Sequence, residues 1–328
     1  MKKEYKKYVI ELDGDTYGFI GDGLEKIIDL KDIGGDKWLV TDFQEAVSRT
    51  MTVEAEFKYV ELVVRRKLQE SGEFDEPVSV ITHWKKKKGK NATDIFFTAI
   101  PTRIYYKYID QIREDQDSVM LFPLYSVLFG VLKNIRTKGP VAVVFQHGRF
   151  ADLIIGTKTR VYYVNRCVAF DAEEEQVASL WDTVRTDIKA IESENRIKVT
   201  KVFSLTWLNS GALPEWPEDM EAEFYSFEDT AVSFDGAIHN ISFLNTIGMQ
   251  SGLGSISSFM EKTFYYAGES IPYLNVILLL AVILLAGGYF RYHQNADQLH
   301  QEFIALDKRI DRIQLESPLA ISKKRYKN

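Results

Sequence analysis

The stretch KYVIELDGDTYGFIGDG, from Lys7 to Gly23, decides the fold of the first part of the chain. Apolar and polar side chains alternate on both sides of Asp13, Gly14 and Asp15. Alternation with a period of two is typical of a strand, and an Asp-Gly pair is typical of a tight turn. The stretch therefore predicts a strand, a turn and a returning strand.

A second unit of the same kind begins at Val141, where VAVVFQHGRFADLIIGTKTRVYYVN predicts three short strands. Further strands are predicted at residues 77–84, 93–100 and 197–207. Helical spacing of apolar residues predicts helices at residues 57–71, 103–115, 125–135 and 173–193. Alternating strands and helices indicate an α/β fold with two lobes, at about residues 1–138 and 139–250.

Composition excludes some classes of protein. The chain has 328 residues and a formal net charge of −6, which argues against a nucleic-acid binder. Its one cysteine, Cys167, cannot form an internal disulfide, so we expect a small buried hydrophobe in a reducing compartment. The N-terminus lacks an apolar run of signal-peptide length, so we expect the body to stay in the cytoplasm.

A long uncharged stretch lies near the end of the chain. From Ser270 to Phe290 there are 21 residues without a charge, enough for a helix that spans about 30 Å of hydrocarbon. Aromatic residues stand at both ends, where the membrane interface favours them. We predict a transmembrane helix at 271–290 after a linker at 251–270. The alternative is a buried core helix.

The segment after this stretch has a heptad pattern. Apolar residues recur at intervals of three and four, at Tyr292, Ala296, Leu299, Phe303, Leu306, Ile310 and Ile313. We predict a helix at 291–316 that continues the membrane span and pairs with a copy of itself or with a partner. The alternative is a helix that rests on its own membrane surface. Ser317-Pro318 ends the pattern, and residues 317–328 form a basic tail without predicted structure.

The body resembles the actin-like PilM/GspL group of type IV pilus and type II secretion assembly proteins. The resemblance is carried by the helix YVELVVRRKLQ, by IFFTAIPTRIYYKYIDQI and by SVMLFPLYSVLFGVL, all between Phe57 and Lys133. The second hairpin falls where that group has its second phosphate-contacting hairpin. The resemblance covers residues 8–250 and implies a two-lobed actin-like domain of the ribonuclease H-like class.

An actin-like cleft would hold ATP with Mg²⁺ between two hairpins that each supply a carboxylate. The resemblance places the residues of such a cleft at Asp13, Asp15, Thr16, Gly148 and Gly211. The second hairpin, however, has Phe145, Gln146 and His147 where a carboxylate is expected, and Asp152 lies beyond the turn. We therefore expect a degenerate cleft, kept as a hinge, with no bound cofactor and no catalytic residue.

The resemblance implies a scaffold at the inner membrane. The body would dock a cytoplasmic partner such as the assembly ATPase, while the span and tail would reach a single-span membrane partner. Self-association through the tail is a further expectation. The alternatives are an ATP-binding switch and a membrane-anchored ATP-dependent enzyme of the actin, sugar-kinase and Hsp70 superfamily.

Two other features of the sequence give only weak indications of function. The five histidines show no metal-ligand spacing, so we expect no metal site. The run KKKKGK, from Lys85 to Lys90, lies at a predicted hairpin tip. It is interpreted either as a solvated loop or as a contact for anionic lipid or an acidic partner.

Overall fold

The computed structural model describes the backbone of residues 7–21, 23–89, 91–115, 117–171, 174–208, 210, 216–217, 220–250 and 254–325. The chain divides into two compact units, Met1–Tyr265 and Tyr266–Asn328. The first unit holds both lobes of the body, and the second consists of the long C-terminal helix beyond its first turns.

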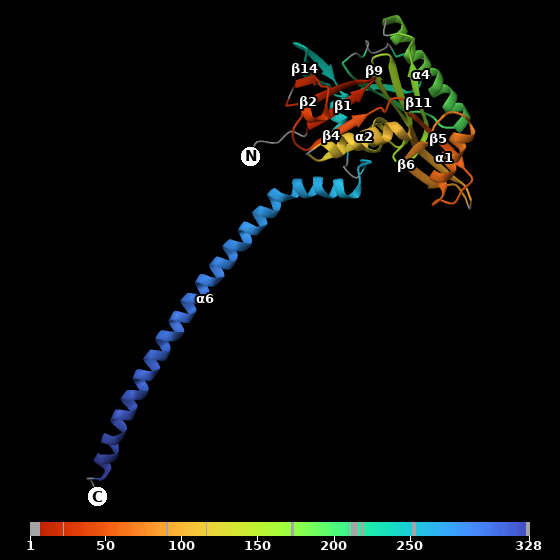
Figure 1. The fold of residues 1–328 in the computed structure, drawn as a ribbon. Helices are drawn as coiled ribbons and strands as arrows, with labels where there is room; N and C mark the ends of the chain where they lie inside the picture. Colours follow the sequence, from red (N-terminus) through yellow and green to blue (C-terminus); the bar gives the residue numbers. More distant parts are fainter. Residues whose placement is uncertain are drawn as a thin grey trace. The chain divides into compact units, whose positions relative to one another are not determined.

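The first lobe is built on a seven-stranded sheet of order β15-β14-β3-β2-β1-β4-β8 (Figure 1). Its strands are β1 (Lys7–Leu12), β2 (Asp15–Ile20), β3 (Gly23–Lys26), β4 (Lys37–Thr41), β8 (Val119–Pro123), β14 (Thr230–Phe234) and β15 (Ala237–Ile241). β1, β2 and β3 are antiparallel neighbours, whereas β4 and β8 run parallel to β1.

The second lobe repeats this arrangement in a five-stranded sheet of order β11-β10-β9-β12-β13. Its strands are β9 (Val141–His147), β10 (Phe150–Thr157), β11 (Arg160–Val168), β12 (Lys201–Thr206) and β13 (Glu223–Ser226). Again the first three strands are antiparallel and the last two run parallel to the first. A duplicated sheet of this order is that of the actin-like, ribonuclease H-like fold, which confirms the predicted fold class.

A small third sheet is inserted into the first lobe, with the order β5-β7-β6. It consists of β5 (Val47–Val53), β6 (Val78–Lys87) and β7 (Thr93–Pro101). The helix α1 (Val60–Glu70) packs on it through Val60, Val64 and Leu68, which recur every four residues on one helix face. The other helices of the body are α2 (Thr102–Glu114), α3 (Leu124–Asn134), α4 (Glu174–Asn195), α5 (Phe243–Ile247) and the short 3-10 helix η1 (Leu30–Asp32).

The two lobes share one of the hydrophobic clusters of the body. It includes Val40 and Phe122 from the first lobe, Phe145 and Ile154 from the second, and Leu128 from α3, which joins them. All five side chains are almost completely buried. The burial of apolar surface across the lobe boundary therefore stabilises both lobes together.

The predicted linker at 251–270 differs from what the structure shows. The backbone NH of Ile256 donates to the Leu121 carbonyl at 2.8 Å, and the Ser257 hydroxyl accepts from the Leu121 NH at 2.8 Å. These bonds fasten the segment to the edge of β8, whose free backbone groups need partners. The C-terminal helix α6 (Phe259–Arg325) already begins inside the predicted linker.

The helix α6 has 67 residues, and within it Tyr273–Ile313 is long and apolar enough to cross a membrane. The most apolar stretch of this helix has no buried residue, so the helix is not the buried core helix of the alternative interpretation. The helix continues without interruption from the predicted span into the heptad segment, as expected. It also extends past Pro318 to Arg325, further than predicted, because the fixed φ of proline is compatible with a helix even though one hydrogen bond is lost.

Candidate functional site

The first hairpin turn has the geometry that the sequence predicts. Asp13 and Gly14 both have positive φ, 53° and 83°, which two-residue hairpins of type I′ require. Asp13 is exposed, and its backbone NH donates to the carboxylate of Asp42 at 3.4 Å. Asp42 directly follows β4, so the turn and the end of β4 lie together.

The other predicted residues of this hairpin have partners within the first lobe. The Asp15 carboxylate pairs with Lys26 Nζ at 2.5 Å and accepts from the Tyr17 hydroxyl at 3.3 Å. The Thr16 carbonyl accepts from the Ile27 backbone NH at 2.9 Å. Asp15 and Thr16 therefore stabilise the pairing of β2 with β3.

The second hairpin turn retains its glycine. Gly148 has a φ of 50° and stands between His147 and Phe150, which face each other across β9 and β10. His147 Nε2 lies 2.8 Å from an oxygen of Asp152, and both side chains are buried. Gly211, the remaining predicted residue, lies outside the described residues.

An arginine connects the two hairpins. Arg166, on β11, donates through Nε and Nη2 to the two oxygens of Asp152 at 2.8 and 3.1 Å. Its Nη1 donates to Asp42 at 3.0 Å, across the boundary between the lobes. We call Asp42, Arg166, Asp152 and His147 the interlobe ion-pair network. The sequence indicated Asp152 only as an unlikely replacement for the missing carboxylate, and no sequence pattern indicated Asp42 or Arg166.

The charges of this network stabilise one another. Burial alone would raise the pKa of Asp152, but the charge of Arg166 and the hydrogen bond from His147 hold that pKa well below its ordinary value. Burial alone would lower the pKa of Arg166, but the charges of Asp152 and Asp42 hold it above its ordinary value. Asp152 and Arg166 are therefore ionised throughout the physiological pH range.

Most of the described carboxylates beside the hairpin turns are already bound to cations of the chain itself. A magnesium ion needs oxygen ligands in octahedral geometry, usually one or two carboxylates besides phosphate and water. Asp152 is bound by Arg166 and His147, and Asp15 is paired with Lys26. Within the described part of the chain, no group of three or more His, Cys, Asp or Glu side chains could hold a metal ion. The guanidinium of Arg166 neutralises carboxylates from both lobes and links them.

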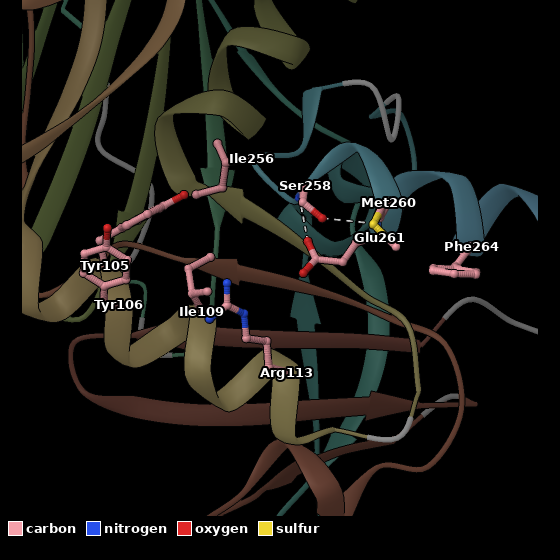
Figure 2. Close-up of a pocket in the computed structure, with 9 residues that line it drawn as sticks. All are labelled: Tyr105, Tyr106, Ile109, Arg113, Ile256, Ser258, Met260, Glu261 and Phe264. Atoms are coloured by element: carbon pink, nitrogen blue, oxygen red, sulfur yellow. Dashed lines mark hydrogen bonds between the residues drawn. The ribbon is translucent and has the colours of Figure 1, made fainter.

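A second candidate site is an apolar groove of about 460 Å³ at the start of α6 (Figure 2). Tyr106 and Ile109 of α2 line it together with Met260 and Phe264 of α6. Met260 and Phe264 are 65% and 62% exposed, which is unusual for such large apolar side chains.

Two of the polar side chains that line this groove serve the helix itself. Ser258 and Glu261 form a capping box at the start of α6, in which the Ser258 NH donates to Glu261 at 2.6 Å and the Glu261 NH donates to Ser258 at 3.2 Å (Figure 2). The Glu261 carboxylate is thus occupied. The groove offers mainly apolar contacts, with the Arg113 guanidinium of α2 among its lining groups.

The predicted partner-binding residues of the tail all lie on α6 and are exposed. They are Tyr292, Leu299, Phe303, Leu306, Ile310 and Ile313. Exposed apolar residues at heptad spacing on one continuous helix form the seam that a helical partner would cover. Their role in binding stays a prediction.

Cys167 is buried on β11 and, within the described residues, free of any disulfide. Burial first, and then the charges of Asp187 and Asp152, raise the pKa of its thiol to about 12. The thiol therefore remains protonated and unreactive, in line with the expected buried hydrophobe.

Three solved structures are similar to this chain at the level of the fold. The cytoplasmic domain of EpsL, an inner membrane component of the type II secretion system of Vibrio cholerae, has 13% identity and a TM-score of 0.40, with 67% of this chain and 89% of that chain covered. A Bacteroides thetaiotaomicron protein with an actin-like ATPase fold has 8% identity and a TM-score of 0.39, with 76% and 98% covered. The PilM-PilN type IV pilus biogenesis complex has 10% identity and a TM-score of 0.38, with 58% and 69% covered.

These likenesses include proteins of the group that the sequence resembles. No protein-family model and no curated protein matches the chain. At these identities and TM-scores the likenesses carry no argument about activity or partners. The assignment of the actin-like fold is based on the strand order of the two sheets.

Proposed function

We propose that the protein is a membrane-anchored, non-enzymatic scaffold of a type IV pilus or type II secretion assembly platform. The observation that carries this proposal is the interlobe ion-pair network. Arg166 joins carboxylates of both lobes beside the two hairpin turns where an actin-like protein would hold phosphates. A domain whose lobes are linked in this way has a fixed surface for docking, without a nucleotide between its lobes.

The second unit would anchor this scaffold at the membrane. The candidate span in α6 would anchor the chain in the inner membrane, with the body in the cytoplasm. The assembly ATPase would be the cytoplasmic partner, and a single-span protein or a second copy of the chain would pair with the exposed heptad face of the tail. These assignments follow the resemblance of the sequence to the PilM/GspL group.

Calorimetric titration of Mg-ATP into the full chain in detergent micelles tests the proposal. We expect no heat of binding even at millimolar nucleotide, about the upper limit of typical enzyme substrate affinities. A matched titration with Mg-GTP controls for nonspecific heat. Saturable binding of Mg-ATP at micromolar concentration would contradict the scaffold and favour the ATP-binding switch. Turnover of the bound ATP would favour the membrane-anchored enzyme.

A further inference from the structure

The surface around α1 and the end of β6 is strongly basic in an acidic chain. Residues 57–70 and 78–89 contain eight Lys and Arg against two Glu, whereas the whole chain has a net charge of −6. α1 packs directly on the sheet that contains β6, and both lie at one end of the body (Figure 1). We call this surface the basic patch, and its cations are Lys58, Arg65, Arg66 and Lys67 together with Lys85 and Lys87, which lie on the α1 face of β6.

Half of these cations are not neutralised by the protein itself. Arg65, Lys67 and Lys87 are exposed and have no carboxylate within ion-pair distance among the residues that the structure describes. By contrast, Lys85 pairs with Glu61 of α1 at 3.3 Å. The patch therefore keeps excess positive charge that faces solvent, and a polyanionic surface would complement it.

Exposed apolar side chains lie among these cations. Phe57, Tyr59 and Leu62 are 38%, 50% and 63% exposed. Lys85 Nζ lies 4.5 Å from the centre of the Phe57 ring, and Lys58 Nζ lies 4.6 Å from that of Tyr59. Aromatic rings next to lysine and arginine are the combination that favours the headgroup region of a bilayer. There the rings meet the acyl boundary while the cations meet phosphate.

We propose that the basic patch docks the body onto the anionic headgroups of the membrane that α6 crosses. The proposal rests on the membrane anchoring in the proposed function, since the candidate span would keep the patch within reach of that surface. Each lysine near an anionic membrane contributes about 1 kcal/mol, and tethering makes the contact effectively intramolecular. This constant proximity, together with the apolar residues in the patch, favours lipid over an acidic protein as its occupant.

The test uses the full chain in nanodiscs of phosphatidylcholine alone or mixed with phosphatidylglycerol. A Leu62→Cys variant is labelled with an environment-sensitive fluorophore, and headgroup-spin-labelled lipid serves as quencher. The buried thiol of Cys167, whose pKa burial raises to about 12, does not compete for the label. We expect quenching that is several-fold stronger in discs with phosphatidylglycerol and that is lost in high salt, because salt screens exposed charges.

Charge reversal separates the patch from general electrostatics. Arg65→Glu with Lys87→Glu should abolish the phosphatidylglycerol-dependent quenching. Lys138→Glu with Lys158→Glu should leave it intact, because these two exposed lysines lie outside the patch and change the net charge equally. Circular dichroism verifies that both variants are folded. Equal quenching in the two kinds of disc, or equal loss in both variants, would overturn the proposal.

A second reporter distinguishes this proposal from the membrane anchoring on which it rests. A fluorophore at Leu285→Cys, within the candidate span, should be quenched by acyl-chain-labelled lipid in every disc. If that signal is present but Leu62→Cys is never quenched, the anchoring holds and the patch faces an acidic protein instead. If the Leu285→Cys signal is absent, the anchoring itself is wrong.

Discussion

Arg166 is the residue on which the linkage of the lobes depends. Its replacement by alanine would leave Asp42 and Asp152 buried without their cation, although Asp152 is 0% and Asp42 only 4% exposed in their side chains. Breaking a buried ion pair on one side costs about 3 to 5 kcal/mol. We expect Arg166→Ala to lower the free energy of unfolding of the body by about that amount. Denaturant unfolding followed by tryptophan fluorescence measures it, since all five tryptophans lie in the first unit.

The pH dependence of this loss has a definite sign. In the unchanged chain the pKa of Asp152 is depressed, because Arg166 and His147 outweigh its burial. Its contribution to stability is therefore complete above the unfolded pKa of about 3.9 and is lost only as the pH falls below it. Without Arg166, burial becomes the larger effect and raises the pKa of Asp152. Protonation then removes the buried charge and reduces the loss of stability in the variant. The stability deficit of Arg166→Ala should be smaller at pH 5 than at pH 7. The difference in the free energy of unfolding should correspond to a shift of about one pKa unit or more.

Two observations would contradict this account. One is a deficit for Arg166→Ala that does not change between neutral and mildly acidic pH. The other is an equal loss in the control Arg66→Ala, which removes an exposed partner of Glu70 on α1 and should leave the unfolding midpoint unchanged.

At the same scale, the sequence could predict the turns but not the contents of the cleft. Residue type alone predicts a positive φ at Asp13, Gly14 and Gly148, and the structure has a positive φ at all three residues. Asp42 and Arg166 are 124 positions apart in the chain, and no local pattern relates them. Which residues form a long-range ion pair depends on how the two sheets are placed in the folded protein, so the pair is recognised only in the structure.

At the scale of elements, Ser257 fastens the segment before α6 to the first lobe. Its hydroxyl accepts from the Leu121 NH at 2.8 Å and donates to the Val119 carbonyl at 3.2 Å, both in a buried place. Ser257→Ala would leave a buried backbone NH without its partner, at a cost of about 1 to 3 kcal/mol. We expect a lower unfolding midpoint by chemical denaturation, whereas Ser226→Ala, on an exposed edge strand, should leave it unchanged. Equal midpoints for the two variants would mean that the segment is a loose linker after all.

The tail of α6 is an element whose pairing can be tested directly. Leu306 and Ile310 are 57% and 48% exposed and belong to the heptad seam. Replacing both with aspartate puts charges where a partner helix needs apolar contacts, so we expect association of the chain in nanodiscs to be lost. Energy transfer between donor- and acceptor-labelled chains measures it. The control, Lys308→Asp with Arg309→Asp, changes charge outside the seam. Energy transfer that survives in the Leu306 and Ile310 variant would show that the seam does not pair.

Element prediction succeeded where one strong period was present and failed where it was not. α1 and α2 lie where the sequence predicts them, because each buries one face, whereas α3, also predicted, is buried on most of its surface. The segment around Ser257 was predicted as a linker because glycine and serine are frequent in it. Its order comes from hydrogen bonds to β8, which composition does not encode. The hairpin of β14 and β15 was also missed, since its return to the sheet of the first lobe is a long-range pairing.

At the scale of the whole molecule, the shared core implies that the two lobes unfold as one. Phe122 of the first lobe and Phe145 of the second belong to the same buried cluster, so separation of the lobes would expose part of the core of each sheet. A chain that ends at residue 270 retains both lobes and the start of α6, including Tyr265, whose hydroxyl accepts from Trp38 Nε1 at 2.8 Å. We expect it to be soluble and monodisperse without detergent, since it lacks the candidate span. Its denaturant unfolding should show one transition that coincides in tryptophan fluorescence and far-ultraviolet circular dichroism. Aggregation would mean that the body depends on its membrane segment, and two separate transitions would mean that the lobes have independent cores.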